Sequence, residues 1–166
     1  MLNKFKQTIF IFLVFTLSGF PHEEKHHNIS NPSKNEKVLQ EAALYSINSD
    51  YLKRVRPIFE KKCFDCHSSQ TQYPWYHMLP GIKQLIDADI KEGGKHLQMD
   101  GDFPFKGHGA PIEDLSAIQK TIEKEEMPPL LYRLMHRDSK PTEQEKSIIL
   151  DWVNKSLENF KKITSK

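Results

Sequence analysis

The chain of 166 residues has no large excess of charge, no regular alternation of polar and apolar residues, and no apolar run of comfortable membrane-spanning length. Its 24 basic and 22 acidic side chains give a formal net charge of +2, which offers no argument for nucleic-acid binding. Without alternating segments or an internal repeat, neither strands nor a repeat architecture is indicated. With 37% apolar residues the chain can form a modest core, and its length suits one domain with short extensions.

Residues 1–20 have the pattern of an export signal. Lys4 and Lys6 precede the apolar run Thr8–Phe20, which is shorter than the roughly 20 residues that a membrane-spanning helix needs. A positive start before a short apolar run is typical of a secretory signal, so we expect a periplasmic or exported protein. No A-x-A sequence marks a cleavage site, so an uncleaved signal that anchors the protein, a membrane tether through residues 1–20, stays open. No cysteine lies nearby, which excludes lipid attachment there.

Residues 21–48 are predicted to form a disordered linker, because they are polar and offer little apolar surface to offset the entropy of ordering. The linker holds His22, His26 and His27, but without an acidic or sulfur partner these histidines favour a solvated tail over a metal site. Removal of residues 1–19 takes away two lysines and leaves 22 basic against 22 acidic groups. Partner docking therefore cannot depend on net charge.

The domain over residues 49–166 is predicted to be all-α. One helix begins near Pro57 and reaches Cys63, since proline suits a first helical turn. Apolar residues recur at helical spacing in three further segments, namely Ile82 to Ile90 ending at Gly93-Gly94, Leu115 to Ile122 stopped by Pro128-Pro129, and Ile148 to Phe160. The last of these follows a T-x-x-E capping box formed by Thr142 and Glu145.

The sequence Cys63-Phe64-Asp65-Cys66-His67 reads C-x-x-C-H, the attachment signature of c-type haem. On a helical turn the two sulfurs lie close enough to form thioethers with the two haem vinyl groups, and the histidine that follows reaches the iron. These are the only two cysteines of the chain. The motif therefore predicts one covalently bound haem c, with His67 as an iron ligand.

Three other interpretations of the two cysteines remain open at this point. A structural disulfide fits an oxidising compartment, but it leaves the histidine unexplained. A thioredoxin-like redox pair needs a βαβ setting, which the helical pattern does not supply. A zinc site would need two more ligands at regular spacing, and the remaining histidines are scattered.

Haem iron also takes a sixth ligand unless that position is left open for a small molecule. Met127 is the main candidate, because it stands just past a helix and before Pro128-Pro129, which stiffen the loop that would hold its thioether. His96 is the next candidate. The other histidines and methionines downstream of the motif are His77, Met78, Met99, His108, Met135 and His136.

Aromatic residues follow the haem motif at Tyr73, Trp75 and Tyr76. Such rings can wall a porphyrin, and an indole N–H or a phenol can donate a hydrogen bond to a propionate. Plain core packing explains them equally well. We take Tyr73 and Trp75 as candidate cofactor contacts.

From Val55 to Trp152 the chain resembles the haem-binding domain family of exported bacterial proteins, a cytochrome-c-like group. The segments that carry the resemblance are V-R-P-I-F-E-K-K-C-F-D-C-H-S-S-Q-T, Y-P-W-Y, I-K-E-G-G-K-H-L, E-E-M-P-P and Y-R-L-M-H. The resemblance implies a cytochrome c-like helical fold wrapped around one haem. It also implies Cys63, Cys66 and His67 as attachment and proximal residues, and Met127 as the distal ligand. The segment Gln98–Pro111 is longer than its counterpart in the family, which leaves the role of His108 open.

These observations predict a monohaem cytochrome that carries single electrons between unidentified redox partner proteins outside the cytoplasm, and not an enzyme. Ligation by His67 and Met127 would keep the iron six-coordinate in both oxidation states. The main alternative is a haem-based ligand-binding or sensor module, in which the sixth position is open or its ligand is displaced. A small peroxidase-like enzyme would need an open site and a distal acid–base pair, and no such pair is evident.

Overall fold

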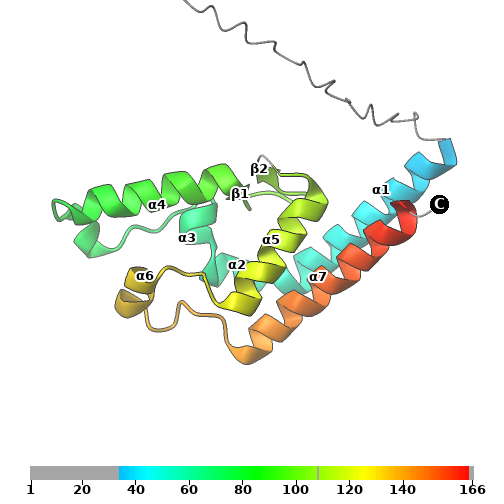
Figure 1. Cartoon of the computed structure of the whole chain (residues 1–166). Coiled ribbons are helices and arrows are strands. Elements are labelled where there is room, and N and C mark those ends of the chain that lie inside the picture. Colours follow the sequence, from blue (N-terminus) through cyan, green and yellow to red (C-terminus); the bar gives the residue numbers. More distant parts are fainter. Residues whose placement is uncertain (1–33, 108, 165–166) are drawn as a thin grey trace, which may run out of the picture. The chain divides into compact units, whose positions relative to one another are not determined.

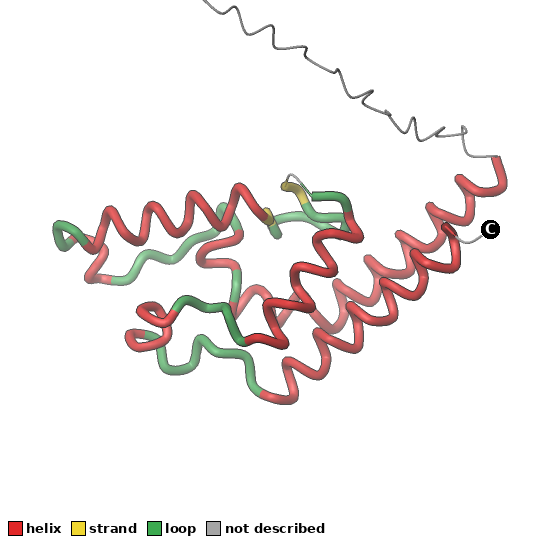
Figure 2. Tube along the Cα trace, in the orientation of Figure 1, coloured by secondary structure: helices red, strands yellow, loops and turns green. Residues whose placement is uncertain are grey.

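A computed structural model describes residues 34–107 and 109–164, and within them the domain is built from helices (Figures 1 and 2). The helical elements are α1 (Lys34–Asp50), the π-helical turn η1 (Tyr51–Val55), α2 (Arg56–Lys62), α3 (Phe64–His67), the 3-10 turn η2 (Trp75–Met78), α4 (Ile82–His96), α5 (Pro111–Lys124), α6 (Leu130–Met135) and α7 (Glu143–Thr164). Strands β1 (Leu97–Gln98) and β2 (Lys106–Gly107) form one short antiparallel pair. The predicted all-α class is confirmed.

The predicted linker is wrong over residues 34–48, because α1 occupies this stretch. Polar composition suggested disorder, but α1 lies along α7 and buries Ile47 between them (Figure 1). The indole N–H of Trp152 donates a hydrogen bond of 3.2 Å to the Ile47 carbonyl. The helix is thus stabilised by tertiary contacts that its own composition does not reveal. The remaining linker residues, the predicted signal over 1–20 and His108 lie outside the described residues.

The helix expected to end at Gly93-Gly94 continues for two residues, to His96. Glycine in a helix interior costs about 1 kcal/mol relative to alanine, so the pair needs a packing reason. That reason lies in the contact of α4 with α3, described below. Beyond α4, the backbone N–H of Met99 donates to the His67 carbonyl at 2.7 Å, which ties the start of the following loop to the C-x-x-C-H turn.

An aromatic core joins η1, α2 and α7. Tyr51 and Trp152 are fully buried, with ring centroids 5.6 Å apart. The unusual loop Gln98–Pro111 adds two rings to this core, since Phe103 packs edge-to-face on Trp152 and Phe105 on Tyr51. The length of this loop therefore has a structural explanation: it supplies core side chains.

The capping box of α7 forms as predicted. The Glu145 N–H donates to the Thr142 hydroxyl at 3.2 Å, and the Thr142 N–H donates to the Glu145 carboxylate at 2.7 Å. From this start α7 packs along α5 and holds it against the core. Among the residues that the structure describes, no helix has the length and apolar character needed to cross a membrane.

Candidate functional site: a cavity beside the C-x-x-C-H turn

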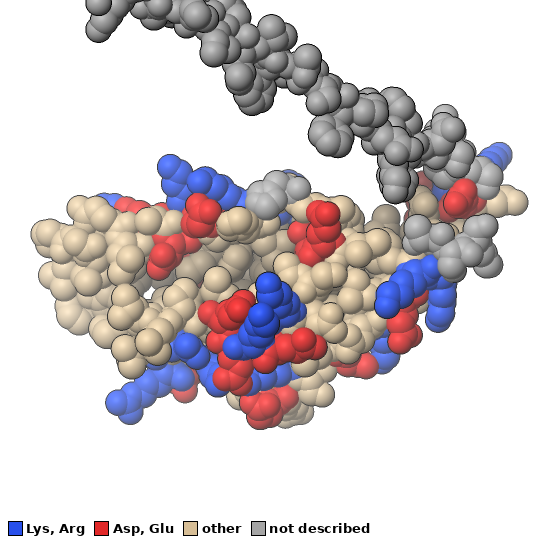
Figure 3. Space-filling model, viewed as in Figure 1, with Lys and Arg blue, Asp and Glu red and all other residues tan. Residues whose placement is uncertain are grey.

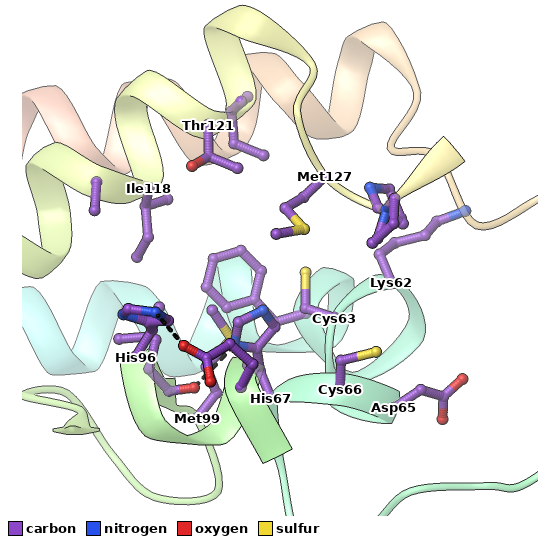
Figure 4. Close-up of a pocket in the computed structure, with 18 of the residues that line it drawn as sticks. Lys62, Cys63, Asp65, Cys66, His67, His96, Met99, Ile118, Thr121 and Met127 are labelled. Carbon is purple, nitrogen blue, oxygen red and sulfur yellow. Dashed lines mark hydrogen bonds and ion pairs between the residues drawn. The ribbon is translucent and has the colours of Figure 1, made fainter. Parts of the chain in front are cut away.

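A cavity of about 530 Å³ lies between the C-x-x-C-H turn and α5 (Figure 4). Roughly 300–1,000 Å³ is the usual size of a small-molecule or cofactor pocket. One wall carries Cys63, Cys66 and His67, together with the last turns of α4. The opposite wall carries Ile118 and Thr121 of α5 and the loop at Met127. The lining is largely apolar, as a buried porphyrin requires.

The imidazole ring of His67 is held by a hydrogen bond to the backbone. Its Nδ1 lies 2.9 Å from the backbone carbonyl oxygen of Leu97. A carbonyl only accepts, so Nδ1 must carry the proton and donate it. In the neutral imidazole Nε2 is then the unprotonated nitrogen, and the ring points into the cavity (Figure 4). This is the tautomer and orientation that a metal-ligating histidine needs.

Cys63 and Cys66 are free thiols that line the cavity on the same turn as His67. Burial, with smaller effects of Cys66 and Glu145, raises the pKa of Cys63 to about 12. Burial and the Asp65 carboxylate raise the pKa of Cys66 to about 11. A catalytic redox pair needs a lowered thiol pKa, so these values argue against the thioredoxin-like interpretation. The raised pKa values keep both thiols protonated, which suits side chains that line an apolar cavity.

Helix α4 approaches the C-x-x-C-H turn unusually closely, and Gly93 makes this possible. A Cβ at Gly93 would lie 2.9 Å from the Cys66 carbonyl oxygen and 3.4 Å from Cε1 of His67. Any side chain there would push α4 away from α3. The close approach brings the end of α4, and with it the Leu97 carbonyl, to His67. This explains a glycine inside the helix.

The loop that carries Met127 is fixed to α7 by charge. Glu125 ends α5 in the left-handed conformation, with φ 54°, and its carboxylate accepts hydrogen bonds from Lys140 and Lys146. These two lysines lower the pKa of Glu125 to about 2. Two residues further on, Met127 lines the cavity wall opposite His67 (Figure 4). The proline pair that follows also lines the cavity, as expected for a stiff loop.

Of the other candidate sixth ligands within the described residues, only Met99 and His96 line the cavity. Both lie on the His67 side in Figure 4, so neither faces His67 from across the cavity. His96 instead places Nε2 3.0 Å from the Glu92 carboxylate on the same helix. Further away, His77 contacts Asp87, His136 stacks on Tyr132, and Met78 and Met135 are exposed.

The structure does not bring the candidate contacts Tyr73 and Trp75 into the cavity. Trp75, the first residue of η2, is 76% exposed, and Tyr73, two residues earlier, is 54% exposed. Tyr132, which the sequence analysis did not single out, lines the cavity instead and donates a 2.6 Å hydrogen bond to Asp65. Burial and this carboxylate raise the pKa of Tyr132. Tyr132 begins the segment Y-R-L-M-H, one of those that carry the family resemblance, and this position could have indicated a role in the site.

The described residues contain no group of three or more histidine, cysteine and acidic side chains that could hold a metal ion by themselves. This gives no support to the zinc interpretation of the two cysteines. An iron at this cavity would need its porphyrin, with His67 and one further side chain as the protein's own ligands. Nε2 of His67, the two free thiols on the same turn and the size of the cavity all fit a haem.

Comparisons with known proteins agree with this fit. A family model described as a haem-binding domain matches residues 20–155. The cytochrome c peroxidase Ccp of Escherichia coli (strain K12) is 33% identical over 103 residues, which cover 61% of this chain and 22% of that protein. The chain thus spans less than a quarter of the length of this curated relative. No solved structure matches the chain.

Proposed function

Because the chain belongs to the haem-binding domain family and binds haem, we propose that it is a monohaem c-type cytochrome that carries single electrons outside the cytoplasm. Cys63 and Cys66 would hold the haem through thioethers, and His67 and Met127 would bind its iron. The observation that carries the proposal is the hydrogen bond from His67 Nδ1 to the Leu97 carbonyl, which leaves Nε2 free in a haem-sized cavity.

Each residue has a defined task in this proposal. The Leu97 carbonyl fixes the tautomer and the ring plane of His67, and by accepting the Nδ1 proton in a hydrogen bond it makes Nε2 a better donor to a metal. The thioether of Met127, as an iron ligand, would favour ferrous iron and raise the potential relative to two histidines. When bound, the haem supplies a one-electron cycle of its iron. With both ligands retained in each oxidation state, little has to rearrange on electron transfer.

Export is also part of the proposal, on the basis of the positive start and apolar run within residues 1–20. The signal either is removed or remains as a membrane tether.

A second candidate function is a haem-based ligand-binding module, and the position of Met127 favours it. This residue lies on a loop and is 46% exposed, so its sulfur can leave the iron without disturbing the core. Displacement would open the sixth position to CO, NO or peroxide. The named activity of the Escherichia coli relative, cytochrome c peroxidase, makes peroxide the natural additional substrate to test.

An optical spectrum of the haem-loaded protein, with and without CO, separates the two functions. An electron carrier with Met127 on the iron should show the weak near-infrared sulfur-to-iron band when ferric and should not bind CO readily when ferrous. Met127→Ala should abolish the band, lower the reduction potential and admit CO. Met135→Ala, an exposed methionine outside the cavity, is the matched control and should behave as wild type. A wild-type protein without the band that binds CO at once would favour the ligand-binding function.

A further inference from the structure

The exposed large apolar side chains of the described residues are concentrated at one end of the domain. Eleven of the fifteen fall within residues 73–85 and 127–135, so their distribution is not that of scattered surface residues. We call this surface the η2–α6 face. It comprises Tyr73, Trp75, Met78, Leu79, Ile82, Leu85, Met127, Leu130, Leu131, Leu134 and Met135.

The two segments form one surface because side chains join them. The Tyr76 hydroxyl lies 3.2 Å from Nε2 of His136, at the end of α6. The His136 ring in turn stacks on Tyr132, with ring centroids 4.1 Å apart. On the other side η2 packs against the start of α4. The η2–α6 face is therefore continuous from α4 to α6.

This face borders the cavity of the proposed haem site. Met127 belongs to both, and Tyr132 of α6 lines the cavity from within. Helices α4 and α6 contain no buried residue, so their apolar side chains contribute little to the core of the described domain. Exposed apolar side chains gathered in this way are typical of an interaction surface.

The η2–α6 face carries almost no charge of its own. Within its two segments the charged residues are Lys83, which pairs with Asp87, and Arg133, which is half-buried. Figure 3 shows an uncharged surface over η2 and the start of α4. A partner that buried a charged group against such a face would lose its hydration without gaining a counter-charge. The chemistry therefore selects an uncharged, apolar partner surface.

We propose that the η2–α6 face is the docking surface for a partner redox protein that presents an uncharged apolar rim around its own haem edge. This rests on the proposed electron-carrier function, because the face matters for electron transfer only if the cavity holds the haem. Docking here would bring the partner close to the cavity, because Met127 and Tyr132 of α6 line it. Association is driven by apolar contact and not by charge steering, so it depends little on salt.

The test uses the haem-loaded protein as its own probe, since a second copy is a haem protein that carries the same face. Electron self-exchange between ferric and ferrous copies is measured by nuclear magnetic resonance line broadening at low and high ionic strength. The wild-type rate should change little with salt. Leu134→Lys places like charges opposite each other in the encounter, and should slow exchange by about tenfold at low salt, with partial recovery at high salt.

Leu39→Lys on α1 is the matched control, because it adds the same charge at an apolar side chain that is 50% exposed and outside the face. It should leave exchange unchanged. Leu134 is 65% exposed, so the fold should tolerate its replacement, which unchanged circular dichroism would confirm. Equal rates for the two variants, with a reversible haem wave retained, would overturn the docking proposal and leave the carrier function standing.

Two other outcomes would also overturn it. The wild-type protein could bind vesicles of phosphatidylcholine and phosphatidylglycerol, with binding lost in Trp75→Lys while self-exchange is unaltered. The face would then be a lipid-binding surface. A wild-type protein that acquires no haem would remove the proposed function, and the docking proposal with it.

Discussion

Replacement of Gly93 by alanine probes the contact that positions His67. The new Cβ would lie 2.9 Å from the Cys66 carbonyl oxygen, a backbone atom that cannot rotate away. Overpacking of this kind costs about 1–3 kcal/mol. The better helix propensity of alanine returns about 1 kcal/mol. We therefore expect Gly93→Ala to destabilise the haem-loaded protein by up to about 2 kcal/mol.

Gly94 offers an internal control in the same helix. A Cβ there would meet only Oε1 of Gln98, at 3.0 Å, and that atom is the far end of a flexible side chain. Gly94→Ala should therefore keep most of the propensity gain and stabilise the protein by up to about 1 kcal/mol. Guanidinium unfolding followed by circular dichroism measures both variants. If Gly93→Ala is as stable as Gly94→Ala, the close contact between α4 and α3 is not as described.

Gly93→Ala should also change the reduction potential of the bound haem iron. Moving α4 away from α3 lengthens the 2.9 Å bond from His67 Nδ1 to the Leu97 carbonyl. A weaker hydrogen bond from His67 to the Leu97 carbonyl makes His67 a poorer electron donor to the iron, so the reduction potential of Gly93→Ala should rise. Voltammetry of the Gly94→Ala protein should give the wild-type potential. A shift of equal size in both variants would mean that helix propensity, and not the position of His67, is responsible.

Three further predictions concern attachment, acid stability and the role of the haem in folding. Cys63→Ala and Cys66→Ala should each leave one thioether or no stable haem protein, measured by acid-acetone extraction and mass spectrometry. Free extraction of haem from the wild-type protein would contradict this. Glu125 has a pKa of about 2 against an ordinary 4.5, so it stabilises the fold above pH 4.5, and this contribution is lost as the pH falls toward 2. In thermal melts, Glu125→Gln should show a smaller loss of stability over this range, and parallel curves would refute the link. Haem-free protein should keep the near-ultraviolet circular dichroism signal of the core around Trp152. Helices α4 and α6 bury no residue, so their amide hydrogens should exchange rapidly, and strong protection of these amides would contradict the prediction.

The parts of the site that depend on local chemistry could be predicted from the sequence. The C-x-x-C-H turn places Cys63, Cys66 and His67 together whatever surrounds them. The capping box at Thr142 fixes the start of α7 by short-range hydrogen bonds. Met127 reaches the cavity because the prolines after it restrict the loop.

The parts that depend on distant contacts could not be predicted. Helix α1 looks like a polar linker until α7 covers Ile47. The close approach of Gly93 to Cys66 brings together residues 27 positions apart, and no local sequence pattern predicts it. Trp75 was predicted to contact the haem because it follows the motif closely, but its side chain is exposed. Aromatic character alone does not distinguish a cavity wall from a docking face.

The most direct test of the account is the mass of the denatured chain after expression with the cytochrome c maturation machinery. We predict one haem per chain that stays attached through denaturation and acid-acetone extraction. This haem should be lost when both cysteines are replaced by alanine. A wild-type chain of unmodified mass, or haem that is extracted freely, would contradict the assignment of Cys63, Cys66 and His67 as a covalent haem site.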